Sequence, residues 1–295
     1  MRIETQHRIT AALFVLALAS VLSPTAGAAD AAAPDWVAPF ADRIHDAWRD
    51  GKPMPQLSAA HPEASLAEAY LVQKHFVARR MKPDGIGGFK AAGVASTAPD
   101  HPLVAVMPAS GVLHAKDKIV IDLAGDPRRH VENEIGYVFH RPVTEPPADV
   151  DALRRCVKAV VAVLEVPGGA VEEAHPSTTN DIVAWNINAK EMILGGERDP
   201  AAVDPDAVTI TCTRDGETVN TARGDLAAGG QWHTLLKTVN RVLQQGYTVQ
   251  PGQVITNGAL GKITPAAPGR YRADYGPLGV IEFERHRDLG VALGL

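Results

Sequence analysis

The chain has 295 residues, of which 45% are hydrophobic and 21% are charged, and its formal net charge is −5. This composition is typical of a globular protein and excludes a disordered or fibrous one. A weakly acidic chain lacks the basic surface that holds nucleic acid, so we expect no nucleic-acid partner.

Residues 1–28 are predicted to be a cleaved signal peptide. Arg2 and Arg8 precede an apolar run from about Ala11 to Leu22, and Ala26-Gly27-Ala28 fits a signal-peptidase site. This run is too short to span a bilayer as a stable anchor. We therefore expect export to the periplasm with no membrane attachment after cleavage. An unprocessed apolar tail is the alternative.

The two cysteines of the chain, Cys156 and Cys212, both lie within apolar runs. An oxidising compartment would allow a disulfide between them. We expect two buried free thiols instead, and their spacing matches no zinc site.

Residues 29–64 are predicted to be a lead-in followed by one helix. Apolar side chains recur at helical spacing over residues 36–48, and Gly51 and Pro53 then end the helix. This segment would precede the main domain.

The main domain is placed at residues 65–295. It opens with Ser65 and Glu68, which have the spacing of a capping box, and the helix that follows is predicted to end near Met81. The serine would cap the first turn, and the glutamate would reach back to the amide of the cap.

A glycine-rich stretch follows at residues 85–93. Its spacing does not match a phosphate-binding loop, but its glycines would let the backbone approach another segment closely. Lys90 lies within this stretch. A lone lysine is usually a solvated surface residue, whereas a partly buried lysine is a usable acid or base.

The remainder of the chain is predicted to be mainly β-strand. Alternating or continuously apolar runs predict strands over residues 118–123, 131–139, 159–166, 208–213, 217–220, 253–256, 271–275 and 280–283. Helices are predicted over residues 150–160 and 235–246. Helices first and many short strands afterwards indicate an α+β fold with a rolled or barrel-like mixed sheet.

Glu132 and Glu134 are the first candidate site residues. In a strand their side chains project from the same face, where two buried carboxylates repel each other unless they share a proton or a cation lies between them. An all-oxygen site of this kind suits Mg²⁺ or Mn²⁺. The alternative is a solvent-facing pair on an edge strand.

Glu165 is the third candidate ligand, because it lies at the end of the continuously apolar strand over residues 159–166, where a charge is costly. The alternative is a strand-end glutamate that already turns to solvent. The Gly/Pro/Ser/Thr-rich loop at residues 167–179 is a candidate mobile lid.

Taken together, these motifs resemble the 2-oxopent-4-enoate hydratase/2-oxo-acid decarboxylase branch of the fumarylacetoacetate hydrolase superfamily. The resemblance covers residues 69–283. The residues that carry it are Ala69-Tyr70-Leu71-Val72-Gln73, Gly88-Phe89-Lys90, Glu132-Asn133-Glu134-Ile135, Leu164-Glu165-Val166, the stretches 181–186 and 256–261, and Gly279-Val280-Ile281-Glu282-Phe283.

The resemblance implies a β-roll fold in which Glu132, Glu134 and Glu165 hold Mg²⁺ or Mn²⁺. It also implies that Lys90 is the acid/base residue. The substrate would be a small 2-oxo acid that chelates the metal through its carboxylate and its C2 oxygen, and the family's oligomers make a homo-oligomer an open expectation.

The resemblance further implies that Asp181, Asn188 and Gly258 bind substrate. The chain departs from the family pattern at residues 169–170, where Gly-Ala replaces the usual Ser-Arg, and at residues 229–231, where Gly-Gly-Gln replaces Gly-His-Pro.

The activity expected from this resemblance is that of a metal-dependent lyase, with hydration of a 2-oxopent-4-enoate-like acid as the first expectation. The alternatives are decarboxylation of a 2-oxo-dienoate, C–C hydrolysis of a diketo acid, or a non-catalytic periplasmic protein that binds a ligand. Hydrolysis would require a water-activating dyad near the N-terminal helices, for which His61, Glu63 and His75 are the candidates.

Overall fold

The computed structural model describes residues 33–82, 84–98, 101–116, 119–122, 130–265 and 267–286. The predicted signal peptide, residues 1–28, lies outside the described residues and stays a prediction. Within the described ranges, no helix has the length and the apolar character needed to cross a bilayer.

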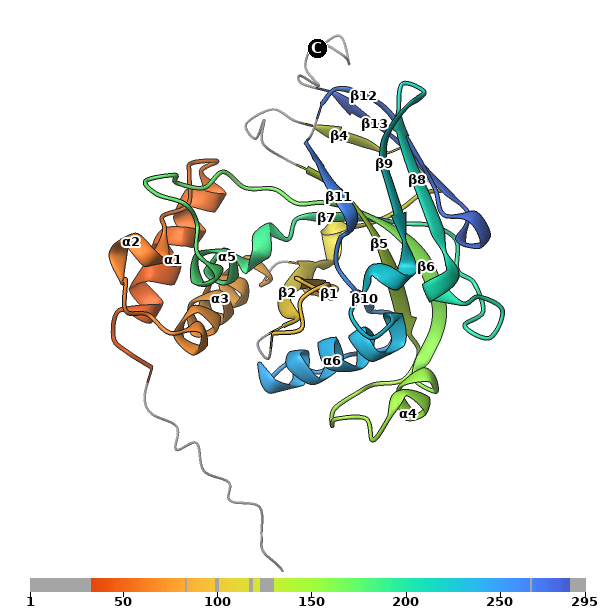
Figure 1. The fold of residues 1–295 in the computed structure, drawn as a ribbon. Helices are drawn as coiled ribbons and strands as arrows, with labels where there is room; N and C mark the ends of the chain where they lie inside the picture. Colours follow the sequence, from red (N-terminus) through yellow and green to blue (C-terminus); the bar gives the residue numbers. More distant parts are fainter. Residues whose placement is uncertain are drawn as a thin grey trace, which may run out of the picture. The chain divides into compact units, whose positions relative to one another are not determined.

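The helices of the described residues gather largely around the N-terminal segment (Figure 1). They are α1 (Val37–Arg49), α2 (Leu57–Ala60), α3 (Leu66–Arg80), α4 (Val150–Arg154), α5 (Thr179–Ala184) and α6 (Gln231–Gln244). Helix α1 packs on α3, and α3 packs on α5. The buried face of α1 consists of Val37, Phe40, Ala41 and Ile44, which recur at helical spacing as expected.

The capping box before α3 is confirmed. The Ser65 hydroxyl accepts a hydrogen bond from the Glu68 backbone N–H at 3.2 Å, and the Glu68 carboxylate accepts one from the Ser65 N–H at 2.7 Å. These bonds satisfy amide groups that the first turn of a helix leaves unpaired.

The strands form two mixed sheets, as the α+β expectation requires. They are β1 (Ile86–Ala92), β2 (Leu103–Pro108), β3 (Val112–His114), β4 (Val120–Asp122), β5 (His130–Phe139), β6 (Val157–Val166), β7 (Glu191–Leu194), β8 (Thr209–Arg214), β9 (Glu217–Arg223), β10 (Val254–Thr256), β11 (Leu260–Pro265), β12 (Gly269–Asp274) and β13 (Val280–His286). The eight-stranded sheet has the order β2-β1-β10-β5-β6-β7-β3, with β11 also paired to β5. The five-stranded sheet has the order β4-β13-β12-β8-β9.

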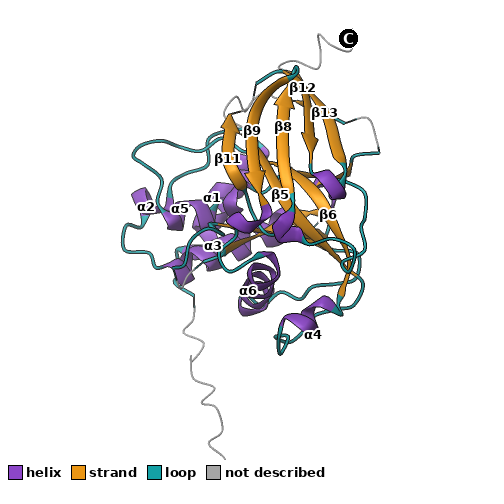
Figure 2. Cartoon of the chain, turned by 45° about the vertical axis from the view of Figure 1, so that its right-hand side comes forward, coloured by secondary structure: helices purple, strands orange, loops and turns teal. Residues whose placement is uncertain are grey.

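Both sheets curl, and they approach each other along β9 and β11 (Figure 2). The side chain of Asn220 on β9 joins them. Its amide nitrogen donates to the Leu260 carbonyl at 3.4 Å, and its oxygen accepts from the Lys262 N–H at 3.0 Å. The predicted β-roll with an N-terminal helical segment is therefore confirmed.

The glycine-rich stretch at residues 85–93 forms β1, and its close approach is to β10. Gly88 pairs with Val254, and a Cβ atom at Gly88 would lie 2.0 Å from the Val254 carbonyl oxygen. Only glycine fits at this point, because any side chain would separate the two strands.

Several predicted elements differ in their bounds, most of all one helix. The helix expected over residues 150–160 ends at Arg154, and Val157 and Val160 belong to β6. The spacing of these two valines matches a helix by coincidence. A run of β-branched residues that is buried on both faces favours a strand that lies between two other strands of a sheet. The expected free thiols are confirmed, with Cys212 buried and Cys156 partly buried.

Candidate metal and substrate site

Three glutamates share one face of the eight-stranded sheet because of the register between β5 and β6. Glu132 pairs directly with Glu165, and Glu134 lies two residues further along β5. Side chains at paired positions and at i, i+2 positions project from the same face. One carboxylate oxygen from each glutamate consequently lies within 4.8 Å of the others.

The glutamate cluster is buried without the partners that buried carboxylates need. Glu134 and Glu165 expose 0% and 1% of their surface, while Glu132 is partly buried. Among the described residues, neither oxygen of Glu134 and only one of the two oxygens of Glu165 makes a hydrogen bond. Orphaned oxygens in a set of hard ligands fit a divalent cation.

Lys90 projects from β1 into the same cluster. Its Nζ contacts Glu165 Oε1 and donates to the Ile187 carbonyl at 3.3 Å. Three strand spacings separate β1 from β6, which would be about 14 Å in a flat sheet. Lys90 pairs with Thr256, and Thr256 pairs with Gly136, which faces Val161 on β6. Glu165 lies four residues further along β6, and Lys90 reaches it across the curl of the sheet.

Burial and mutual repulsion govern the ionisation of this cluster. Burial raises the pKa of Glu134 to about 7 although the charge of Lys90 opposes this, and burial raises the pKa of Glu165 well above its ordinary value. Burial lowers the pKa of Lys90, but the three glutamates outweigh it and the pKa is raised. With every group ionised, one ammonium leaves two negative charges unbalanced, which a divalent cation would neutralise.

A cavity of about 820 Å³ opens onto this cluster, with Lys90 and Glu132 in its wall. Its other walls come from β1 and the residues after it, from the loop at residues 167–179, from the turn after α5 and from β11. Volumes of this size are typical of small-molecule sites.

The turn after α5 has an unusual backbone. Asn186, Ile187 and Asn188 have φ values of 54°, 49° and 53°, a left-handed conformation that is costly for a β-branched residue such as Ile187. The Asn186 side chain stabilises the turn, since its oxygen accepts from the Val106 N–H at 2.9 Å and its nitrogen donates to the Val106 carbonyl at 2.8 Å. This turn presents the Ile187 carbonyl to Lys90.

The sequence prediction did not single out Asn186 or Ile187. A signal was present, because asparagine is one of the few residues that tolerate left-handed conformations, and two asparagines flank Ile187. That signal does not indicate which backbone group the turn would present to the site.

Of the predicted substrate residues, Asn188 lines the cavity, but Asp181 and Gly258 do not. Asp181 is buried and its carboxylate accepts hydrogen bonds from the N–H and hydroxyl groups of both Ser58 and Thr178, at 2.6–2.9 Å. It therefore caps α5 and ties it to α2, and the expected contact with substrate stays a prediction.

Gly258 lies close to β1, and its expected contact with substrate stays a prediction. Its φ is 81°, and a Cβ atom there would lie 2.7 Å from the Ala91 carbonyl oxygen. It allows the chain to turn closely against β1, and its neighbour Ala259 reaches the cavity wall instead.

The loop at residues 167–179, the predicted lid, forms one wall of the cavity and is anchored to the N-terminal segment. Met54 and Val171 form a β-bridge, and the Gln56 side chain donates to the His175 carbonyl at 2.8 Å. Mobility of this loop stays a prediction. Its outer residues are exposed.

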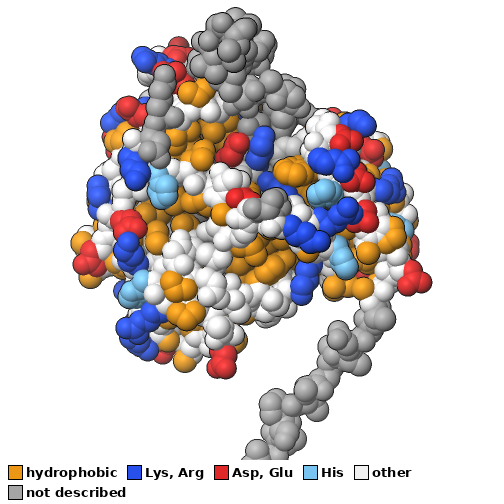
Figure 3. Space-filling view, turned by 180° about the vertical axis from the view of Figure 1, so that it is seen from behind, with side chains coloured by type: hydrophobic (Ala, Val, Ile, Leu, Met, Phe, Trp, Pro, Cys, Tyr) orange, Lys and Arg blue, Asp and Glu red, His pale blue; other side chains and the backbone are white. Residues whose placement is uncertain are grey.

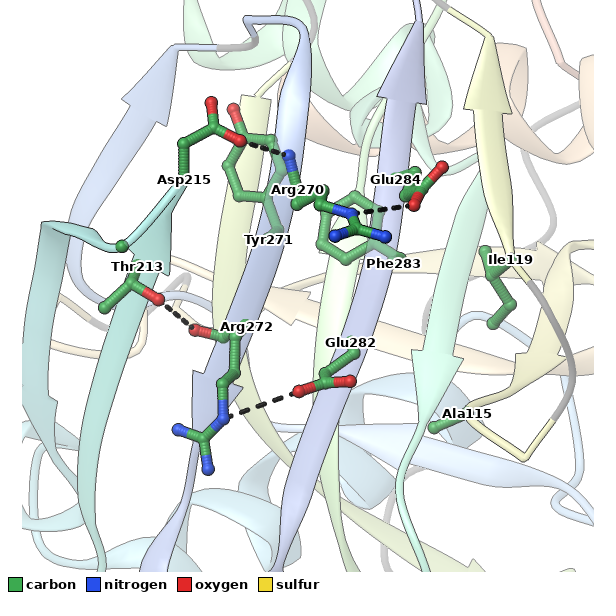
Figure 4. Close-up of a pocket in the computed structure, with 11 residues that line it drawn as sticks. Ala115, Ile119, Thr213, Asp215, Arg270, Tyr271, Arg272, Glu282, Phe283 and Glu284 are labelled. Atoms are coloured by element: carbon green, nitrogen blue, oxygen red, sulfur yellow. Dashed lines mark hydrogen bonds and ion pairs between the residues drawn. The ribbon is translucent and has the colours of Figure 1, made fainter.

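A second cavity, of about 600 Å³, lies on the five-stranded sheet (Figure 4). Its charged side chains pair across the strands, Arg270 with Glu284 at 3.0 Å and Arg272 with Glu282 at 3.5 Å. These groups are largely exposed and already partnered, so they resemble ordinary surface ion pairs. The glutamate cluster is the stronger candidate for chemistry.

The fold and the site define a class of protein: a rolled mixed sheet with a cluster of three carboxylates and a buried lysine, of which Glu132 and Lys90 line one cavity. Residues 85–283 match the model of the family described as fumarylacetoacetate (FAA) hydrolase C-terminal. The chain belongs to this family.

Similar proteins identify the branch. A 2-keto-4-pentenoate hydratase of Paraburkholderia xenovorans (strain LB400) is 26% identical over 263 residues, which are 85% of this chain and 96% of that protein. A 4-oxalocrotonate decarboxylase of Pseudomonas sp. (strain CF600) is 24% identical and covers 80% of this chain and 90% of its own length. The chain is an enzyme of this hydratase and decarboxylase branch.

A solved structure supports the fold. The 4-oxalocrotonate decarboxylase from Pseudomonas putida G7, complexed with magnesium and adipate, superimposes with a TM-score of 0.76 at 21% identity. The superposition covers 85% of this chain and 97% of that chain.

Proposed function

We propose that the protein is a metal-dependent lyase that adds water to a small unsaturated 2-oxo carboxylic acid of the 2-oxopent-4-enoate type. The observation that carries this proposal is the buried glutamate cluster with its unpartnered oxygens, next to a cavity whose wall contains Lys90 and Glu132. Similarity to hydratases supports the reaction type.

Glu132, Glu134 and Glu165 would hold the cation, either Mg²⁺ or Mn²⁺. When bound, such an ion supplies Lewis-acid stabilisation of the negative charge that develops on a 2-oxo acid as it enolises. The donor set fits, because all three ligands are carboxylates and hard divalent ions prefer oxygen.

Lys90 would move the proton. Its Nζ is held between Glu165 and the Ile187 carbonyl and lines the cavity, so it can give a proton to the carbon chain or take one from it. The amide of Asn188 lines the same cavity and would orient the polar end of the substrate.

Decarboxylation is the second candidate, because the same site could stabilise the enolate that remains after CO₂ leaves, and a decarboxylase is among the structural relatives. Hydrolysis is less favoured. His61 stacks on Trp36 with ring centroids 4.0 Å apart, and neither His61, Glu63 nor His75 lines the cavity.

The test compares metal-induced stabilisation of the wild type with that of Glu134→Gln. The wild type should gain about 2.7 kcal/mol of unfolding free energy at a hundredfold excess of Mg²⁺ or Mn²⁺ over Kd. Glu134→Gln should lose this gain, yet its metal-free form should be more stable than the wild type because a buried unpaired carboxylate is gone. Thermal unfolding with and without metal measures both effects.

Two further variants complete the test. Glu217→Gln removes an exposed glutamate on β9, and it should respond to metal as the wild type does. Lys90→Met should still respond to metal but lose at least a hundredfold in turnover of a 2-oxo acid substrate. A wild type that ignores both ions would contradict the proposal.

A further inference from the structure

The hydroxyl group of Thr256 is buried beside the glutamate cluster. Thr256 is the last residue of β10 and exposes 1% of its surface, and its Oγ1 makes no hydrogen bond within the described part of the chain. A buried hydroxyl that makes no hydrogen bond costs stability, so its presence in a native fold points to a use when a ligand is bound.

The strand register places Thr256 next to Glu134. Thr256 pairs with Lys90 on β1 and with Gly136 on β5, so its side chain lies on the face of the sheet that carries Glu134. Glu134 is two residues from Gly136 and is therefore the diagonal neighbour of Thr256, a position that side chains can reach. Gly136 has no side chain that could separate the two.

The carboxylate of Glu134 is a suitable acceptor for this hydroxyl. Burial raises the pKa of Glu134 most strongly, and the nearby Thr256 hydroxyl opposes that rise. Neither oxygen of Glu134 completes a hydrogen bond with a described residue. A hydroxyl donates one proton and a carboxylate oxygen accepts one, so each group lacks what the other offers.

The other donors around Glu134 are engaged elsewhere. Lys90 contacts Glu165 and donates to the Ile187 carbonyl. Asn133 projects from the opposite face of β5, where its oxygen accepts a hydrogen bond from Tyr275 at 3.3 Å. Among the described strand residues next to Glu134 on its own face, Thr256 is the uncharged donor.

We propose that Thr256 is a positioning residue for the metal site: its hydroxyl donates to the Glu134 carboxylate and fixes the orientation in which that carboxylate binds the cation. This role rests on the proposed function, which assigns Glu134 to the metal. Thr256 itself is not expected to touch the ion. Removing a group that orients a metal ligand lowers metal affinity by roughly ten- to a hundredfold.

The test measures the Kd of Mn²⁺ by titration calorimetry for the wild type and three variants at Thr256. Thr256→Val keeps the shape of threonine without the hydroxyl, Thr256→Ala removes the hydroxyl with less bulk, and Thr256→Ser keeps it. We expect the valine and alanine variants to bind Mn²⁺ roughly tenfold more weakly than the wild type. Thr256→Ser should bind within about twofold of the wild type.

Thr264→Val is the matched control. Thr264 is also buried, and its hydroxyl also makes no hydrogen bond to a described residue, but it pairs with Val131 and so lies on the face opposite Glu134. This variant should bind Mn²⁺ as the wild type does. Without metal, both valine variants should unfold at or above the wild-type temperature, because each replaces an unpartnered hydroxyl by a methyl group.

The outcomes separate this role from the proposed function. If Thr256→Val and Thr256→Ala bound Mn²⁺ as tightly as the wild type, the role of Thr256 would be overturned while the glutamate site stood. Equally weak binding by Thr256→Ser would assign the loss to packing and would overturn it as well. A wild type that did not bind Mn²⁺ would contradict the proposed function itself.

Discussion

We expect the carboxyl group of Glu134 to couple metal binding to pH. Its ordinary pKa is 4.5, and burial raises the pKa to about 7 in the folded, metal-free protein. Between these values the folded state holds a proton that the unfolded chain has lost. The metal-free fold should therefore lose up to about 3 kcal/mol of stability as pH rises through this window.

The stabilisation gained from added metal should increase with pH, because the cation binds the ionised carboxylate and competes with the proton for it. We expect the metal-induced increase in melting temperature to be small near about pH 5 and large near about pH 8. Thermal unfolding at both pH values, with and without Mg²⁺, measures it. An increase of equal size at the two pH values would show that Glu134 does not titrate in this range, and Glu134→Gln should remove the trend.

Single residues were predictable where their chemistry was unambiguous. Two glutamates at i, i+2 in a strand must share a face, so Glu132 and Glu134 were correctly expected to lie together. The capping role of Asp181 was not predicted, because a carboxylate among apolar residues suits a helix cap as well as a ligand site. Thr178 and Asp181 have capping-box spacing, which would have favoured the cap.

At the scale of elements, the turn at residues 186–188 is expected to depend on Asn186. Asn186→Ala removes both hydrogen bonds to Val106 and leaves buried backbone groups of Val106 unpaired, which should lower the unfolding free energy by about 3 kcal/mol. It should also lower turnover, since the Ile187 carbonyl would no longer be held against Lys90. Denaturant unfolding and initial rates measure the two effects.

Asn180→Ala is the matched control. The Asn180 side chain makes one hydrogen bond, to the Ala64 carbonyl at 2.6 Å, away from the cavity wall. Asn180→Ala should lower the unfolding free energy by about 1 kcal/mol and leave turnover unchanged. If the two variants behaved alike, the turn would have no special part in placing Lys90.

Eight strands were predicted from the sequence, whereas five other strands of the described residues were not: β1, β2, β3, β7 and β11. The neighbours of each strand were not predictable. Periodicity indicates that residues 131–139 and 159–166 are strands, and it carries no information on which strands pair or in which register. That β1 lies beside β10, and that the curl then brings Lys90 to Glu165, follows from contacts between segments far apart in the chain. Such non-local pairing is what sequence patterns leave open.

At the scale of the whole molecule, the N-terminal helices belong to the same unit as the sheet. The family match begins at residue 85, yet Phe40 and Ile44 of α1 are buried with Phe76 of α3 in the hydrophobic core. We expect a chain that begins at residue 65 to melt at a lower temperature than one that begins at residue 29, because removing α1 exposes this surface.

The same truncation removes Met54 and Gln56, which anchor the loop at residues 167–179. Limited proteolysis should therefore cut this loop faster in the shorter chain. Equal melting temperatures and equal cleavage rates would mean that the N-terminal helices are an independent addition.

Side chains of both charges share one face of the molecule. Viewed from behind, acidic and basic side chains are interspersed around hydrophobic patches (Figure 3).

The pairing of Glu132 with Glu165 also constrains how the sequence can vary in length. Because side chains alternate along a strand, a shift of one residue between β5 and β6 would turn Glu132 and Glu134 to the face opposite Glu165. Substitutions within these strands can be tolerated, but an insertion or deletion of a single residue would dismantle the site. In evolutionary terms, length changes between related proteins should collect in the connection at residues 140–156 and spare the two strands.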